Sequence, residues 1–133
     1  MPIFLDTNIL IYAYSDDEPD KQAIARALCS LPDRWISTQV MIEFSNIVRR
    51  KMGMDWKDIT LALLELRKNF NILTTTDATI IMASRLADRY QLSWFDSLIV
   101  SASLETNANT LYSEDLNNSQ VYENQITVVN PFK

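Results

Sequence analysis

Four acidic residues in this sequence occupy positions that could bring them to one site. Asp6 ends a short apolar run, Ile3 to Leu5, that is typical of a strand buried on both faces. Glu43 lies about one turn into a predicted helix, Asp96 lies in the first turn of another, and Asp115 follows a predicted strand. Chemistry in an open parallel sheet gathers beyond the carboxyl ends of its strands, so we expect the four carboxylates to share one cleft.

A group of carboxylates repels itself unless a cation lies among its members. Mg²⁺ and Mn²⁺ are the natural cations, because both prefer oxygen ligands and tolerate several waters. A metal held with open coordination positions can polarise a phosphoryl oxygen and generate hydroxide from bound water. The four acids therefore indicate metal-dependent phosphodiester hydrolysis. Each acid taken singly also has a structural explanation, as a turn, helix-cap, solvated helix or loop residue. All four are expected at the same edge of the sheet, however, and this favours a shared site over four separate structural roles.

Hydroxyl and amide side chains accompany the acids. We expect them to orient the carboxylates or to contact a substrate phosphate, and they are Thr7, Asn8, Ser37 and Ser113.

A basic run at the end of a predicted helix, Arg49-Arg50-Lys51, has two explanations that the sequence leaves open. The three side chains could complement the helix dipole, or they could contact a phosphate backbone. We expect the three tryptophans, Trp35, Trp56 and Trp94, to pack in the core or at an interface rather than to stack on bases.

Composition excludes several classes of protein. The chain has no histidine, which removes serine and cysteine catalysis that depends on imidazole. One glycine, Gly53, cannot form a phosphate-binding loop or a dinucleotide fingerprint, and one cysteine, Cys29, cannot form an internal disulfide. The net charge of −5 argues against nucleic-acid binding by charge alone, although a bound metal can supply positive charge locally. No signal segment or membrane span is evident, so we expect a cytoplasmic protein.

The 133 residues, 47% of them hydrophobic, fit a single domain over 1–133. Strands and helices alternate, which predicts an α/β fold with three α/β/α layers and a central parallel sheet of about five strands. The expected strands are 3–5, 34–37, 71–74, 110–112 and 126–129, and the expected helices are 20–31, 38–52, 56–70, 77–90 and 94–105. An apolar stretch at 9–14 is assigned to neither class. Residues 114–125 are expected to form a loop, and Asn107 and Asn109 to adopt left-handed turns.

The chain resembles the PIN-domain ribonucleases, and among them the VapC-like toxins of toxin–antitoxin pairs, along essentially its whole length. Four segments carry the likeness: Phe4 to Leu10, Ile36 to Thr38 with Glu43, Asn46 and Arg49-Arg50, Leu92 to Ile99, and Leu111 to Asp115. The resemblance implies that Asp6, Glu43, Asp96 and Asp115 are catalytic and hold Mg²⁺ or Mn²⁺, and that the substrate is RNA. It also implies a partner, an antitoxin with a basic C-terminal segment, and a homodimer.

Two departures from the family pattern concern the fourth segment. Ser113 stands where threonine is more common, and the hydroxyl is kept. Leu116-Asn117-Asn118 lacks a further acid that many members have, which implies one metal position and leaves a second open.

Two other functions remain as alternatives. A haloacid-dehalogenase-like phosphatase also has an aspartate after its first strand, but it needs a second acid two residues later, where this sequence has Asn8. A PIN-like module that only binds a protein partner would not need all four acids.

Overall fold

The computed structural model describes all residues, 1–133, as six helices and six strands. The strands are β1 (Ile3–Leu5), β2 (Arg34–Ser37), β3 (Asn71–Leu73), β4 (Thr110–Tyr112), β5 (Val121–Tyr122) and β6 (Ile126–Val129). The helices are α1 (Thr7–Tyr14), α2 (Pro19–Leu28), α3 (Thr38–Met52), α4 (Trp56–Asn69), α5 (Asp77–Tyr90) and α6 (Trp94–Glu105).

The strands form one sheet in the order β3-β2-β1-β4-β6-β5. All pairs are parallel except β5 with β6, which is antiparallel. The chain moves from β1 to β2 and β3 in one direction and then returns to place β4 on the other side of β1. Strand order therefore reverses between β1 and β4, and a crevice at the carboxyl ends of these two strands is the expected ligand site of such a sheet.

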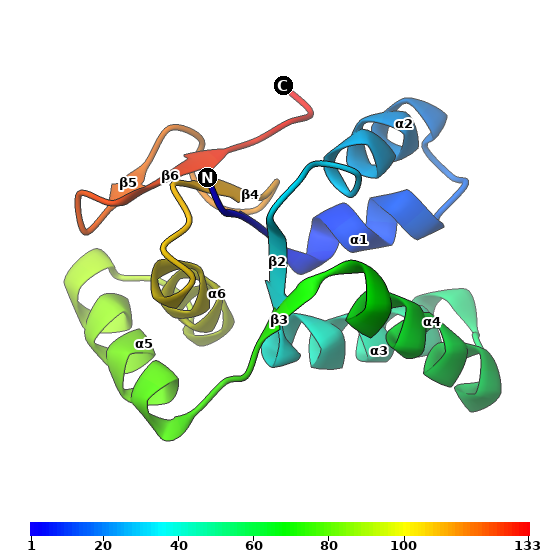
Figure 1. The fold of residues 1–133 in the computed structure, drawn as a ribbon, viewed down its shortest axis with the longest axis horizontal. Coiled ribbons are helices and arrows are strands. Elements are labelled where there is room, and N and C mark those ends of the chain that lie inside the picture. Colours follow the sequence, from blue (N-terminus) through cyan, green and yellow to red (C-terminus); the bar gives the residue numbers. More distant parts are fainter.

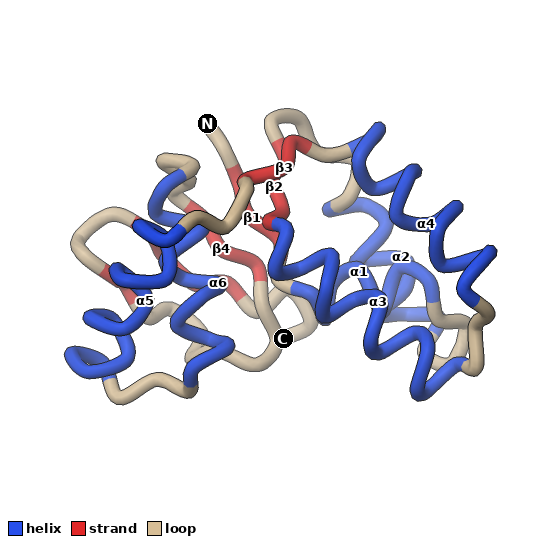
Figure 2. The backbone as a smooth tube through the Cα atoms, turned by 90° about the horizontal axis from the view of Figure 1, so that it is seen from below, coloured by secondary structure: helices blue, strands red, loops and turns tan.

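The sheet lies between two groups of helices. Figure 1 shows α5 and α6 on one side of the strands and α1 to α4 on the other, and the view in Figure 2 agrees. All three residues of β1 are buried, as a central strand covered on both faces requires. The predicted three-layer α/β fold is confirmed. None of the helices combines the length and apolar composition needed to cross a bilayer.

Most element boundaries agree with expectation, and the apolar stretch that the sequence left unassigned is helical. The apolar stretch after Asp6 is helix α1, which begins at Thr7. Periodicity could not identify it, because a short apolar run is compatible with either a buried helix or a strand. Residues 114–125 contain β5, whose two residues pair with β6.

Two predictions, one about a left-handed residue and one about the end of a helix, were wrong. Asn107 has the expected left-handed backbone, with φ of 60°, whereas Asn109 does not. The amide of Asn109 instead donates to the carbonyl oxygen of Pro2, and its carbonyl oxygen accepts from the amide of Thr127. Helix α2 ends at Leu28 rather than residue 31, since the chain continues in tighter turns.

The buried face of α5 does not coincide with its most apolar residues. Ile80 is exposed, and Thr79, Ala83 and Leu86 are buried instead. Thr79 tolerates burial because its hydroxyl group donates a hydrogen bond to Glu105 of α6.

Candidate active site

Asp6 follows β1 and caps α1, and this places its carboxylate at the point where strand order reverses. The residue is 4% exposed. The amide of Thr7 and the hydroxyl of Ser113 each donate to it at 2.7 Å, and the amide nitrogen of Asn8 lies 3.4 Å from it. Burial raises the pKa of Asp6 to about 7, against the lowering effect of these hydrogen bonds, and the charges of Glu43 and Asp115 raise it further.

Glu43 reaches the same region from the second turn of α3. The hydroxyl of Thr7 donates to Oε2 of Glu43 at 2.8 Å, and the amide group of Gln39 donates to Oε1 at 3.1 Å. Thr7 therefore links the first acid to the second, with its backbone bonded to Asp6 and its side chain bonded to Glu43.

Asp115 approaches from the turn after β4. The side-chain amide of Asn8 donates to its Oδ2 at 3.1 Å, and its own backbone amide donates to Oγ of Ser113 at 3.2 Å. Asn8 and Ser113 thus connect Asp6 to Asp115. These contacts place both side chains where they can orient the acids.

Asp96 lies in the first turn of α6, where its backbone amide donates to the capping hydroxyl of Ser93 at 3.3 Å. Its carboxylate takes part in no hydrogen bond within the chain and faces the cavity that the other acids line.

All four predicted acids line this one cavity, of about 440 Å³, which we call the acidic cavity. Its other charged wall residues are Asp17, Glu18, Lys51 and Glu114. None of the four acids pairs with a lysine or arginine, because the chain's ion pairs lie elsewhere. No three acidic side chains converge closely enough to hold a metal ion as they are oriented here. The donor set nevertheless fits Mg²⁺ or Mn²⁺, since it consists of carboxylate oxygens without a neutralising cation.

The basic run at the end of α3 separates into different roles. Arg49 donates to the carbonyl oxygen of Met54 and lies 5.5 Å from the ring centre of Trp56, so it stabilises the turn after Gly53. Lys51 lines the acidic cavity, and Arg50 lines a neighbouring one. The dipole explanation applies to all three, because they occupy the last turn.

Ser37 has a capping role in this structure. It is fully buried, and its hydroxyl caps α3 by accepting from the amide of Val40 at 3.2 Å. No hydrogen bond joins it to the four carboxylates.

One network near the site was missed by sequence reasoning. Lys21 of α2 lies 2.7 Å from Oε2 of Glu114 and 3.1 Å from the hydroxyl of Tyr12, which itself donates to Oε1 of Glu114 at 2.6 Å. The backbone amide of Glu114 donates to Asn8, so the network supports the turn that bears Asp115. No sequence signal could reveal a contact between residues 93 positions apart.

The tryptophans meet the expectation only in part. Trp35 is half-buried, whereas Trp56 is 59% exposed and Trp94 is 43% exposed. Trp56 and Trp94 are therefore not core residues.

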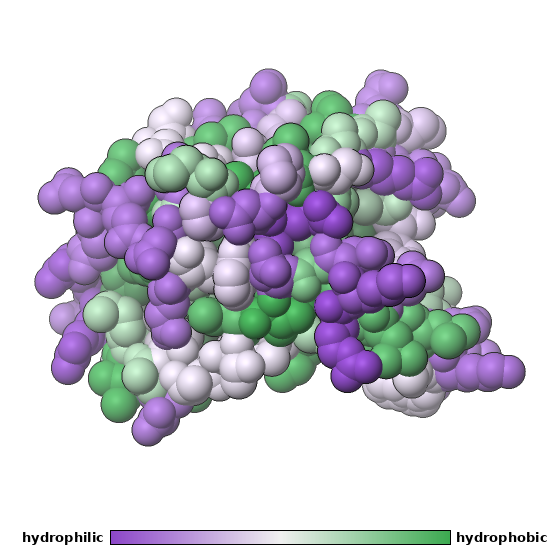
Figure 3. Space-filling view, in the orientation of Figure 1, coloured by the Kyte–Doolittle hydropathy of each residue, from purple (hydrophilic) through white to green (hydrophobic).

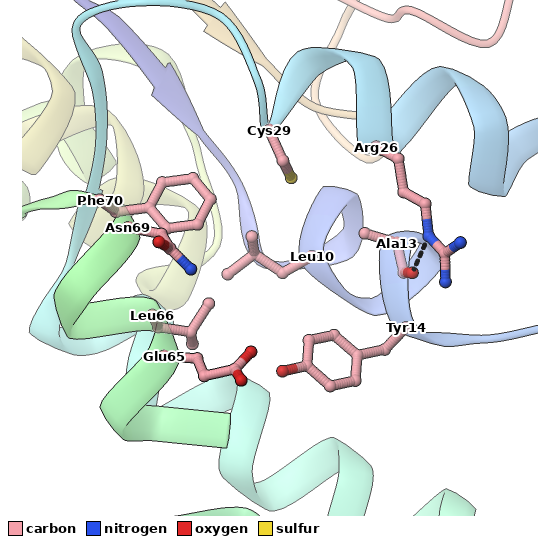
Figure 4. Close-up of a pocket in the computed structure, with 9 residues that line it drawn as sticks. All are labelled: Leu10, Ala13, Tyr14, Arg26, Cys29, Glu65, Leu66, Asn69 and Phe70. Atoms are coloured by element: carbon pink, nitrogen blue, oxygen red, sulfur yellow. Dashed lines mark hydrogen bonds between the residues drawn. The ribbon is translucent and has the colours of Figure 1, made fainter. Parts of the chain in front are cut away.

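A second groove, of about 340 Å³, lies between α1, α2 and α4 and has mainly apolar walls. Figure 4 shows the carboxylate of Glu65 facing the hydroxyl of Tyr14 across it, and Arg26 bonded to the carbonyl of Ala13. Burial raises the pKa of Cys29 to about 11, which disfavours the thiolate at neutral pH. This groove holds no catalytic arrangement.

Comparison with known proteins identifies the family. Residues 3–124 match the PIN domain. The chain belongs to the PIN-domain family. No curated protein matches the sequence significantly.

Several solved structures share the fold of this PIN domain at low sequence identity. A toxin–antitoxin complex from Klebsiella pneumoniae has 21% identity and a TM-score of 0.68, with 98% of each chain covered. VapC20 of Mycobacterium tuberculosis, a toxin that cleaves the sarcin-ricin loop, has 17% identity and a TM-score of 0.70, over 85% of this chain and 91% of that one. FitAcB from Neisseria gonorrhoeae has 18% identity and a TM-score of 0.65, with 98% of each chain covered.

Proposed function

We propose that this PIN domain is a Mg²⁺- or Mn²⁺-dependent endoribonuclease and the toxin of a toxin–antitoxin pair. The observation that supports this most is the acidic cavity, where Asp6, Glu43, Asp96 and Asp115 gather without a basic partner. The likeness in fold to a solved toxin–antitoxin complex and to the toxin VapC20 agrees with it.

In this proposal the four carboxylates hold the metal ion. When bound, the ion polarises a phosphoryl oxygen and lowers the pKa of water. Thr7, Asn8 and Ser113 keep the acids oriented through the hydrogen bonds described above. Asp6 is the most firmly held, because three donors converge on its carboxylate.

The environment of Asn8 bears on the phosphatase alternative. Its amide group is bonded to both Asp6 and Asp115, and an amide cannot serve as the general acid that such an enzyme needs at this position. A PIN domain that only binds a protein partner is the remaining rival.

The experiment is a cleavage assay with purified protein, RNA and millimolar Mg²⁺ or Mn²⁺. Asp6→Asn and Asp96→Asn each remove a ligand with little change of shape, so cleavage should fall by about 100-fold or more. Asp88→Asn, at an exposed position of α5, is the matched control and should cleave like the wild type. RNA cleavage at wild-type rates by both ligand variants, purified away from host nucleases, would refute the assignment. A wild type that cleaves nothing would favour the binding module.

We also propose a partner, a small antitoxin whose basic C-terminal segment enters the acidic cavity. Arginine suits such a site, since it stays charged and can bond a carboxylate through two parallel hydrogen bonds. Its guanidinium would take the electrostatic place of the metal, so Mn²⁺ should weaken antitoxin binding. Affinity measured with and without Mn²⁺, with an arginine-to-alanine antitoxin as control, checks this. If Mn²⁺ binds the free toxin but leaves the antitoxin affinity unchanged, the arginine does not occupy the place of the metal.

A further inference from the structure

Lys21 of α2 does not line the acidic cavity, yet its ammonium group is joined to a wall residue of that cavity, Glu114. Nζ of Lys21 lies 2.7 Å from Oε2 of Glu114, and the two side chains are only 30% and 27% exposed. Glu114 directly precedes Asp115, so this ion pair holds the residue next to a proposed metal ligand. Lys21 is therefore placed to influence the acids without touching them.

Two aromatic rings fix the position of the ammonium group. Nζ of Lys21 lies 4.7 Å from the ring centre of Tyr12 and 5.5 Å from that of Phe132, and the two rings pack edge to face, with their centres 4.9 Å apart. Phe132 lies in the segment after β6, which Figure 1 shows running toward α1 and α2. Aromatic faces attract a cation, so the rings hold the ammonium group over Glu114.

The surface around this network is well solvated. Figure 3 shows mostly hydrophilic atoms around the loop that leads into α2, at the right of that face, where Asp16, Asp17 and Glu18 are exposed. An isolated ion pair in such surroundings contributes little to stability, because water and side-chain entropy oppose it. The pair between Lys21 and Glu114 is restrained by the two rings, so its geometry is defined even though its net energy is small.

The connection from Lys21 to the acids runs through Asn8. The backbone amide of Glu114 donates to Oδ1 of Asn8 at 3.2 Å. The side-chain amide of Asn8 donates in turn to Oδ2 of Asp115 at 3.1 Å, and it lies 3.4 Å from Oδ2 of Asp6. A displaced Glu114 would therefore turn the Asn8 side chain and change the separation of these two carboxylates. Groups that orient metal ligands in this way affect how tightly the metal binds.

We propose that Lys21 is a positioning residue for the metal site and that it acts through Glu114 and Asn8. Its ion pair keeps the turn after β4 where the carboxylate of that turn and the carboxylate after β1 can share a metal ion. Phe132 assists by keeping the ammonium group over Glu114. The inference rests on the proposed function, because it requires the four acids to hold a metal ion. It gives α2 and the segment after β6 a part in metal binding.

Positioning and simple charge predict opposite effects on metal affinity. Lys21 carries a positive charge close to an acidic site, so its removal should tighten the binding of a divalent cation if charge alone mattered. Loss of positioning should weaken the binding, and changes to groups that orient metal ligands lower metal affinity by about 10- to 100-fold. The sign of the change in Mn²⁺ affinity therefore distinguishes the two roles.

The test is a titration of the purified protein with Mn²⁺, in which electron paramagnetic resonance measures the free ion. Lys21→Met should raise the Kd for Mn²⁺ about tenfold. Lys21→Arg keeps the charge and can bond the Glu114 carboxylate, so it should bind Mn²⁺ nearly as the wild type does. The double variant Lys21→Met, Glu114→Met keeps the net charge of −5 and should bind as weakly as Lys21→Met. Wild-type affinity in the double variant would show that Lys21 acts by charge.

A matched control lies on another part of the surface. Arg89 is 2.7 Å from Glu123, and Glu123 accepts a hydrogen bond from the hydroxyl of Tyr90, as Glu114 does from Tyr12. Arg89→Met should therefore leave the Kd for Mn²⁺ unchanged. Equal weakening by Arg89→Met and Lys21→Met, or tighter binding by Lys21→Met, would overturn the proposal.

A milder variant keeps the test valid if Lys21→Met does not fold. Phe132→Leu keeps an apolar side chain beside Lys21 but removes the ring, so it should raise the Kd for Mn²⁺ about threefold. An unchanged Kd in this variant would show that the ring does not hold the ammonium group in place.

A second measurement separates failure of the positioning role from failure of the proposed function. In metal-free protein, the side-chain amide resonances of Asn8 should shift in Lys21→Met and stay in place in Arg89→Met, as followed by NMR. Mn²⁺ binding that Asp6→Asn abolishes and Lys21→Met leaves unchanged overturns the positioning role and leaves the metal site. A shift of the Asn8 resonances in a protein that binds no Mn²⁺ supports the path from Lys21 to Asn8 and overturns the proposed function.

Discussion

The hydroxyl of Ser113 donates a hydrogen bond of 2.7 Å to Oδ2 of Asp6, across 107 positions of sequence. Oγ of Ser113 also accepts hydrogen bonds from the backbone amides of Asp115 and Leu116. One small side chain thus joins the end of β1 to the turn after β4, and the relative position of two acids depends on it.

Ser113→Ala should therefore destabilise the fold and impair the site. Removing the donor leaves a buried carboxylate and two amides short of a partner, which costs about 1–3 kcal/mol in the free energy of unfolding. Ser103→Ala is the control, because that buried hydroxyl bonds only a carbonyl of its own helix. Urea denaturation at pH 8 compares the two. Equal losses in the free energy of unfolding of the two variants would show that the contact with Asp6 contributes no more than a hydrogen bond within a helix.

The raised pKa of Asp6 predicts a pH dependence of stability in metal-free protein. The folded-state value of about 7 exceeds the unfolded value of 3.8, so the folded state binds this proton more tightly. The stabilisation is complete below the unfolded pKa and is lost as pH rises through the folded one. In EDTA, the wild type should lose about 2–3 kcal/mol relative to Asp6→Asn between about pH 5 and about pH 8. Parallel stability curves for the two proteins would contradict this.

Metal binding should offset the mutual repulsion of the four carboxylates. A cation that binds only the folded state stabilises it by about 1.4 kcal/mol at ~10 times its dissociation constant. Mn²⁺ should therefore raise the melting temperature of the wild type by about 3–6 °C. The increment should shrink in Asp6→Asn, whose metal-free form should melt no lower than the wild type. Thermal unfolding with and without Mn²⁺ measures both, and equal increments would place the ion elsewhere.

The Lys21 network should be detectable in the titration of Glu114. Burial acts to raise the pKa of Glu114, but hydrogen bonds from Lys21 and Tyr12 outweigh it and hold the pKa below its ordinary value. Lys21→Met should move the pKa of Glu114 upward, as read from the side-chain carboxyl resonance by NMR. Arg89→Met is the control, since Arg89 pairs with Glu123 on another part of the surface. A Glu114 titration unchanged by Lys21→Met would mean that the ammonium group does not hold it.

The sequence by itself determined the α/β class, the four candidate acids and the types of all elements except α1 and β5. Local signals were enough here, such as the capping serine before Asp96 and the left-handed Gly53 at the end of α3. It could not classify the apolar run of α1, because a short run that is apolar at nearly every position lacks the periodicity that distinguishes a helix from a strand.

Only the tertiary structure decided which residues meet. The reversal of strand order at β1 brings Asp115 beside Asn8 and Ser113 beside Asp6. Phe95 and Trp56 are exposed, although composition and propensity would place them in a core. Hydrogen bonds and solvent exposure between distant segments depend on how the layers pack. That packing is a property of the whole chain, and no local pattern contains it.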